Sequence, residues 1–156
     1  MIESIRLKRQ TTNPLSIGEV IDYRGATFVI THILGIEVVG KHLPNPTVVY
    51  YCLGQQFGTP DLSSEYLPTL TELSFKSDQF DNLPEVGEIF FDNALGIWVN
   101  IDEITNVRFE DTEMFITFKF SPVPEWSKEQ LTQAMNRHRL NRMKLVRKDT
   151  NQAHNF

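Results

Sequence analysis

The chain has 156 residues, of which 40% are hydrophobic and 22% are charged, and its net charge is −5. This length supports one good core or two small ones, and the composition is that of a globular protein rather than a disordered or fibrous one. No apolar run approaches the ~18 residues that span a bilayer, and no secretory signal pattern opens the chain. The single cysteine, Cys52, excludes an internal disulfide and a cysteine zinc cage. We therefore expect a cytoplasmic protein without a membrane partner.

Two segments of the chain share one residue pattern. Residues 17–20 (IGEV) and 86–89 (VGEI) each contain an apolar residue, a glycine, an acid and a β-branched residue, sixty-nine positions apart. The first segment leads through a turn into 26–33 (ATFVITHI), and the second leads through a turn into 97–101 (IWVNI). Alternating side chains bounded by Gly, Asn and Asp predict a β-hairpin in each segment.

A further strand is predicted after each hairpin, at 46–54 and at 112–120. In the first hairpin the alternation predicts Phe28 and Ile30 on one face and Ile33 on the other. In the second segment, Ile97, Val99 and Ile101 are predicted to share one face of their strand. In the strand at 112–120, one face is predicted to carry Met114, Ile116, Phe118 and Phe120. Short antiparallel strands at this spacing are typical of small barrels or sandwiches.

The predicted fold class is mainly β, with two tandem small SH3-like β-barrel or sandwich units and a C-terminal amphipathic basic helix. The first unit covers 1–54 and the second covers 85–124. Residues 55–84 are predicted to connect them, with one short strand near "TELSF", and their aromatic side chains either contact a partner or pack over the two units. The helix is predicted over 125–148, opened by a Ser127 capping box, with a frayed tail at 149–156.

Charge is divided unevenly along the sequence. From residue 127 onward there are seven Lys or Arg and two acids, whereas residues 1–126 contain eight Lys or Arg and eighteen acids. The basic residues include six within twelve positions: Arg137, Arg139, Arg142, Lys144, Arg147 and Lys148. Such a segment suits either a polyanionic partner or an acidic surface.

Signatures of catalysis are absent from the sequence. It contains no GxGxxG, GxxxxGK[ST], HExxH or GxSxG motif. Cys52 lies within an apolar strand, where a buried, unreactive thiol is expected. His32 is expected to be a half-buried side chain, and the acids near 102–113 fit no calcium loop. We therefore expect no enzyme, no cofactor and no metal site.

Two functions remain open. The first is a non-catalytic protein-binding module of the adaptor, immunity or anti-defence type, from a prokaryote or a mobile element, with an acidic, aromatic-bearing β surface. Its candidate contacts are Phe57, Tyr66, Asp102, Glu103 and Asp111. The alternative is a nucleic-acid-binding accessory protein that uses the six basic residues of the predicted helix. The sequence does not determine the oligomeric state.

Overall fold

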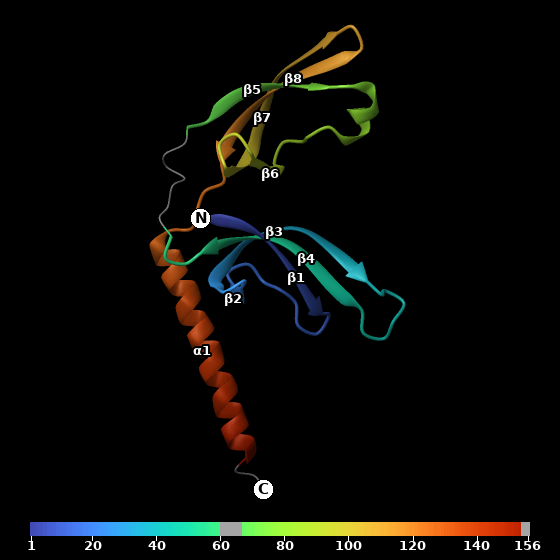
Figure 1. Ribbon diagram of the computed structural model, residues 1–156. Coiled ribbons are helices and arrows are strands. Elements are labelled where there is room, and N and C mark those ends of the chain that lie inside the picture. Colours follow the sequence, from blue (N-terminus) through green and yellow to red (C-terminus); the bar gives the residue numbers. More distant parts are fainter. Residues whose placement is uncertain (60–66, 154–156) are drawn as a thin grey trace. The chain divides into compact units, whose positions relative to one another are not determined.

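The computed structural model describes residues 1–59 and 67–153, with side chains as far as Lys144. The chain forms two four-stranded antiparallel sheets and one C-terminal helix (Figure 1), so the predicted mainly β class with a terminal helix is confirmed. Two units are distinguished. Within the described residues, unit 1 comprises 1–59 and 126–153, and unit 2 comprises 67–125.

Unit 1 contains the first sheet and the helix. Its strands are β1 (Ile2–Gln10), β2 (Val20–Tyr23), β3 (Ala26–Val39) and β4 (Thr47–Gln56), arranged in the order β1-β4-β3-β2. The helix α1 (Lys128–Ala153) follows the second unit in sequence and packs on the first sheet. N- and C-terminal segments of the chain therefore belong to one unit.

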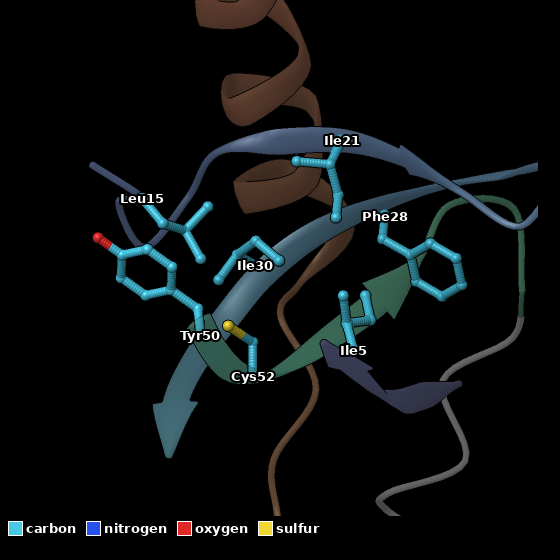
Figure 2. Packing of buried hydrophobic residues seen from close by; sticks show 7 residues of the cluster. All are labelled: Ile5, Leu15, Ile21, Phe28, Ile30, Tyr50 and Cys52. Carbon is cyan, nitrogen blue, oxygen red and sulfur yellow. The ribbon is translucent and has the colours of Figure 1, made fainter. Parts of the chain in front are cut away.

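One face of the first sheet carries the main core of unit 1. The side chains shown in Figure 2 come from all four strands and from the β1–β2 loop, and they point toward one another: Ile5, Leu15, Ile21, Phe28, Ile30, Tyr50 and Cys52. Ile33 also packs against this cluster. We predicted Ile33 on the opposite face from Phe28 and Ile30, and that prediction was wrong. A β-bulge between Ile30 and His32 adds one residue to β3, which reverses the faces beyond it.

The opposite face of the first sheet is covered by the start of α1. Val20 and Val29 contact the buried Ala134, and Leu131 and Met135 pack against them. Gln55, a buried side chain of β4, holds the backbone before the helix. Its amide Nε2 donates to the carbonyl of Trp126 at 3.0 Å, and its Oε1 accepts from the Trp126 N–H.

The predicted capping box at the start of α1 is also present. Ser127 Oγ accepts from the Gln130 N–H at 3.2 Å, and Gln130 Oε1 accepts from the Ser127 N–H at 2.9 Å. The helix runs to Ala153. It therefore includes residues 149–153, which we had expected to fray.

Unit 2 contains the second sheet. Its strands are β5 (Thr69–Phe75), β6 (Ile89–Asp92), β7 (Ile97–Glu110) and β8 (Glu113–Pro122), in the order β5-β8-β7-β6, with the 3-10 helix η2 (Ser77–Asn82) after β5. The strand expected near "TELSF" is β5, and it belongs to this sheet rather than to a free connection. The face predicted for each of the two strands is confirmed. Val99, Ile101, Ile116, Phe118 and Phe120 form one buried cluster packed by Ile97 and Met114.

The two sheets have matching details beyond their strand order. Gly18 and Gly87 both have positive φ values, 90° and 94°, which favour glycine. The Gly18 N–H donates to the Ile30 carbonyl at 2.7 Å, and the Gly87 N–H donates to the Ile101 carbonyl at 2.8 Å. These bonds explain why IGEV and VGEI recur in the sequence. In the described residues both sheets remain open, with β1 and β2 as edges of the first and β5 and β6 as edges of the second.

Candidate functional site

The charge of the protein is divided between its two units. Residues 67–125 of unit 2 contain twelve Asp or Glu and three Lys or Arg, a net charge of −9. The residues of unit 1 at 1–59 and 126–153 contain six acids and twelve Lys or Arg, a net charge of +6. The sequence division at residue 127 therefore becomes a division between an acidic unit 2 and a basic unit 1.

The core face of the second sheet continues beyond the core as an exposed apolar surface. The strand register aligns Thr71, Phe118 and Ile104 in one row across β5, β8 and β7. The next rows toward the hairpin tip are Leu73–Ile116–Val107 and Phe75–Met114–Phe109. Residues directly opposite each other in an antiparallel sheet share a face. The exposed apolar members of these rows are Leu73, Ile104, Val107 and Phe109. We refer to these four residues as the hairpin surface.

Exposure increases along the hairpin surface toward its tip. Phe118 in the first row is fully buried, while Ile104 is 39% exposed, Val107 is 49% exposed and Phe109 is 64% exposed. The long β7–β8 hairpin extends past the short strand β6, which pairs only with residues 97–100 of β7 (Figure 1). The described part of unit 2 thus leaves the outer half of an apolar face uncovered, a feature that marks an interaction surface.

Acidic side chains border the hairpin tip. A broad open depression of about 460 Å³ lies there, lined by Lys76, Ser77, Glu110, Asp111, Thr112, Glu113 and Phe115. Asp111 occupies the β7–β8 turn with a positive φ of 55°, which Asp tolerates better than most residues. Its position is therefore set by the turn, and its carboxylate remains exposed.

The three candidate acids do not form one site. Asp102 and Glu103 lie at the first bulge of β7, and Asp111 lies eight residues further along the hairpin. At about 3.3 Å per residue, this separation is roughly 26 Å. Asp102 accepts hydrogen bonds from Asn100 Nδ2 at 2.9 Å and from Ser121 Oγ at 2.8 Å. These acids are therefore spread along β7 and do not converge, and Glu103, opposite Lys119, belongs to the face away from the hairpin surface.

The opposite face of the second sheet is organised by Arg108. Its guanidinium donates to both carboxylate oxygens of Glu72, at 2.8 and 3.2 Å, and to Glu110 at 3.0 Å. It also lies over the Phe115 ring, 4.1 Å from the ring centre. Hydrogen bonding from Arg108 lowers the pKa of Glu72. One of the three basic side chains of residues 67–125 is thus already paired with acids, so unit 2 presents a mainly negative surface.

The two aromatic candidates have different positions. Phe57 is half-buried in unit 1, where it packs against Val20 and Val29 together with the helix residue Ala134. Its ring is therefore largely used by the core of unit 1 and offers little contact area to a partner. Tyr66 lies outside the described residues.

The basic candidates lie along α1. Arg137 lies beside the turn at Gly18, since a β-carbon there would come within 3.6 Å of its Nη2. Every residue from Arg139 to Lys144 is exposed, including Arg142 and the apolar Leu140 and Met143. Arg147 and Lys148 belong to the helix, but their side chains lie outside the description. The helix therefore presents at least three basic side chains to solvent.

The two side chains most capable of chemical reactivity, Cys52 and His32, are at least partly buried in unit 1. Cys52 is buried in the core of unit 1 as predicted, and burial raises the pKa of its thiol, which keeps it protonated. Burial lowers the pKa of His32, whose Nδ1 lies 2.9 Å from Thr31 Oγ1. Within residues 1–59 and 67–153, no three or more His, Cys, Asp or Glu side chains gather as a metal site would require.

Comparison with protein-family models, with curated proteins and with solved structures finds no match. None of the described helices is both long enough and apolar enough to cross a membrane.

The hairpin surface was not found from the sequence. Its β7 members, Ile104, Val107 and Phe109, are separated by three and two positions, which does not match the period of a strand. The bulges at Asp102 and Thr105 each add an unpaired residue, and this places all three on the core face. The available signal was the run of apolar residues at irregular spacing in an otherwise acidic segment.

Proposed function

We propose that the protein is a non-catalytic binding module that recognises another protein through the hairpin surface of unit 2. The observation that carries this proposal is the uncovered outer half of an apolar sheet face, ending in the 64% exposed Phe109. Large aromatic side chains at the centre of such patches supply much of the energy of protein interfaces.

The charge of unit 2 bears on the chemistry of the partner. Asp111 lies in the turn at the tip, whereas Glu103, Glu110 and Glu113 occupy register positions of the opposite face of the sheet. With a net charge of −9 on residues 67–125, unit 2 attracts a partner with basic side chains around an apolar centre. Complementary charge chiefly increases the rate of association and excludes partners of the same sign.

A comparative capture experiment tests this proposal. The full chain is immobilised, and partners retained by the wild type are compared with those retained by Phe109→Asp and by an Asp102→Lys/Glu103→Lys variant. Both variants are expected to lose the same partner, because one removes the apolar centre and the other lowers the negative charge of unit 2 that attracts a basic partner.

Leu70→Asp is the matched control for this experiment. Leu70 is exposed on the opposite face of the same sheet, beside Lys119, so its replacement leaves the hairpin surface intact. A partner retained equally by the wild type and by all variants would refute the proposal.

We also infer that the two sheets are two copies of one small SH3-like β unit, each open in the described residues. The shared strand order, the paired glycine turns and the matching bulges of β3 and β7 support this inference. The signs of two charges are also reversed between the sheets. In the first sheet Arg6 and Glu37 both lie beside Tyr51, whereas in the second Glu72 pairs with Arg108, which lies over Phe115. The acidic residues gathered in unit 2 would then distinguish a binding copy from its basic neighbour.

The alternative function is nucleic-acid binding through α1. It is favoured by the exposed basic residues Arg139, Arg142 and Lys144 in a unit with a net charge of +6. Fluorescence anisotropy with labelled DNA and RNA over a salt series tests it. Replacement of the three residues by Gln is preferable to truncation at Trp126, because truncation would uncover Val20 and Val29.

If these side chains contact phosphates, the triple Gln variant is expected to reduce the salt slope of log K by about 2–3, at roughly 0.7–0.9 per contact. An unchanged slope, or no binding by the wild type at low salt, would reject the alternative.

A further inference from the structure

The outer half of β3 has one free edge. β3 and β7 each contain 14 residues, but only the first four of each strand pair with β2 or β6. Among the described residues, the backbone of 31–39 bonds only to β4, and the backbone of 102–110 bonds only to β8. Each sheet therefore presents unpaired N–H and C=O groups along one side of its longest strand.

The two free edges differ strongly in charge. The edge at 102–110 carries Asp102, Glu103, Arg108 and Glu110, whereas the edge at 31–39 carries Glu37 as its one Asp, Glu, Lys or Arg. Charged side chains on an edge strand oppose pairing with another strand. The β3 edge instead exposes four apolar side chains, Leu34 (43%), Ile36 (64%), Val38 (48%) and Val39 (50%). The β7 edge is thus protected against strand pairing, and the β3 edge is not.

We propose that the free edge of β3 pairs antiparallel with the same edge of a second copy of this chain, around a two-fold axis at Ile36. This register places Ile36 opposite Ile36 and Leu34 opposite Val38, so apolar side chains meet apolar ones. An axis at Glu37 would place two carboxylates directly opposite each other, which is unfavourable.

A second copy is the occupant that the charges favour. The described residues of unit 1 carry a net charge of +6, but the sheet of residues 1–59 that contains β3 has five Lys or Arg and four acids and contributes only +1. The other +5 lies on residues 126–153, so two such sheets meet without strong repulsion. Two copies of the β7 edge would instead bring together two units with a net charge of −9 each. A two-fold pair also closes after two chains, which is the commonest symmetry of soluble oligomers. The surface lies in unit 1 and is separate from the hairpin surface, so either proposal can fail without the other.

Disulfide cross-linking of the full chain tests the register. Opposed residues of an antiparallel pair have Cα atoms about 4.5–5.5 Å apart, which a disulfide can bridge. Ile36→Cys is expected to form a covalent dimer on mild oxidation, and the buried Cys52 does not compete. Val107→Cys is the matched control at the equivalent position of β7, and it is expected to form no covalent dimer. Cross-linking of neither variant, or of both equally, would overturn the proposal.

Sedimentation equilibrium tests the association itself. The wild type is expected to dimerise, and Ile36→Lys is expected to weaken the dimer at least about tenfold, because two ammonium groups would meet at the axis. Val107→Lys is expected to leave the dimerisation constant unchanged. Both positions are exposed, so both variants should retain the fold, as circular dichroism will check. A wild type that is monomeric at about 100 µM would overturn the proposal.

Discussion

Two isoleucines at equivalent positions of the two cores can be used to test whether the units unfold independently. Ile30 is fully buried in the core of unit 1, and Ile101, which accepts the matching glycine hydrogen bond, is 1% exposed in unit 2. Replacing a buried Ile by Val costs about 0.5–1.5 kcal/mol. For units of this size, about 1 kcal/mol corresponds to about 4–8 °C in the unfolding midpoint. Ile101→Val is therefore expected to lower the midpoint of unit 2 by about 2–12 °C, and Ile30→Val that of unit 1.

The two tryptophans provide separate reporters. Trp98 lies in unit 2, 5.5 Å from Phe91 between ring centres, and Trp126 packs in unit 1. Thermal unfolding would be followed by fluorescence in a Trp126→Phe background and in a Trp98→Phe background. Each Ile→Val substitution is expected to shift only the reporter of its own unit. Equal shifts of both reporters for either substitution would refute the reasoning, because the two cores would then unfold as one.

Three further outcomes are expected. Gln55→Ala leaves both polar groups of Trp126 without their side-chain partner and should destabilise unit 1 by about 1–3 kcal/mol, as measured by urea unfolding. Ser127→Ala removes the helix cap and should cost about 1 kcal/mol, visible in helical circular dichroism during thermal unfolding. The folded-state pKa of Glu72 is lowered by Arg108, so this carboxylate stabilises unit 2 above the pKa of about 4.3 of an exposed Glu, and the contribution is lost as pH falls further. Glu72→Gln should therefore weaken unit 2 at pH 7 and match the wild type in strong acid.

Each of these outcomes has a contrary result. An unchanged urea midpoint for Gln55→Ala would mean that water replaces the side chain. A Ser127→Ala helix that unfolds with the wild type would mean that packing alone holds the first turn. For Glu72→Gln, a stability difference that persists undiminished in strong acid would show that the Arg108 contact does not depend on the carboxylate charge.

The strands were predictable where their alternation is regular. Strand β8 alternates without interruption, and its predicted core residues, such as Phe118, are those of the structure. In β3 the bulge at Thr31 reverses the faces, and Ile33 therefore packs on the side opposite to the predicted one. A bulge depends on which strand pairs with which, and this information is not present in a local pattern. For the same reason, the segment predicted at 97–101 is only the first part of the longer strand β7.

The acidic character of unit 2 was predictable from the sequence, but the geometry of its surface was not. The acids near 102–113 all lie in unit 2, yet Asp102 and Asp111 lie at different points of one long hairpin, and Glu103 belongs to the face away from the hairpin surface. The apolar Phe109 could not be distinguished from a core residue, because exposure depends on where the short strand β6 stops. The helix start was correct, because the cap formed by Ser127 is a local interaction.

The hydrogen bonds between Gln55 and Trp126 join residues that are 71 positions apart, and all strands of unit 2 lie between them. Unit 2 is therefore an insertion within a discontinuous unit 1. During translation, β5 to β8 leave the ribosome before α1 does, so unit 2 can complete its sheet while Val20 and Val29 are still uncovered. In that interval the nascent chain exposes an apolar sheet face that the helix will later cover. The acidic insertion, synthesised before α1, gives the unfinished chain the net charge that opposes its aggregation.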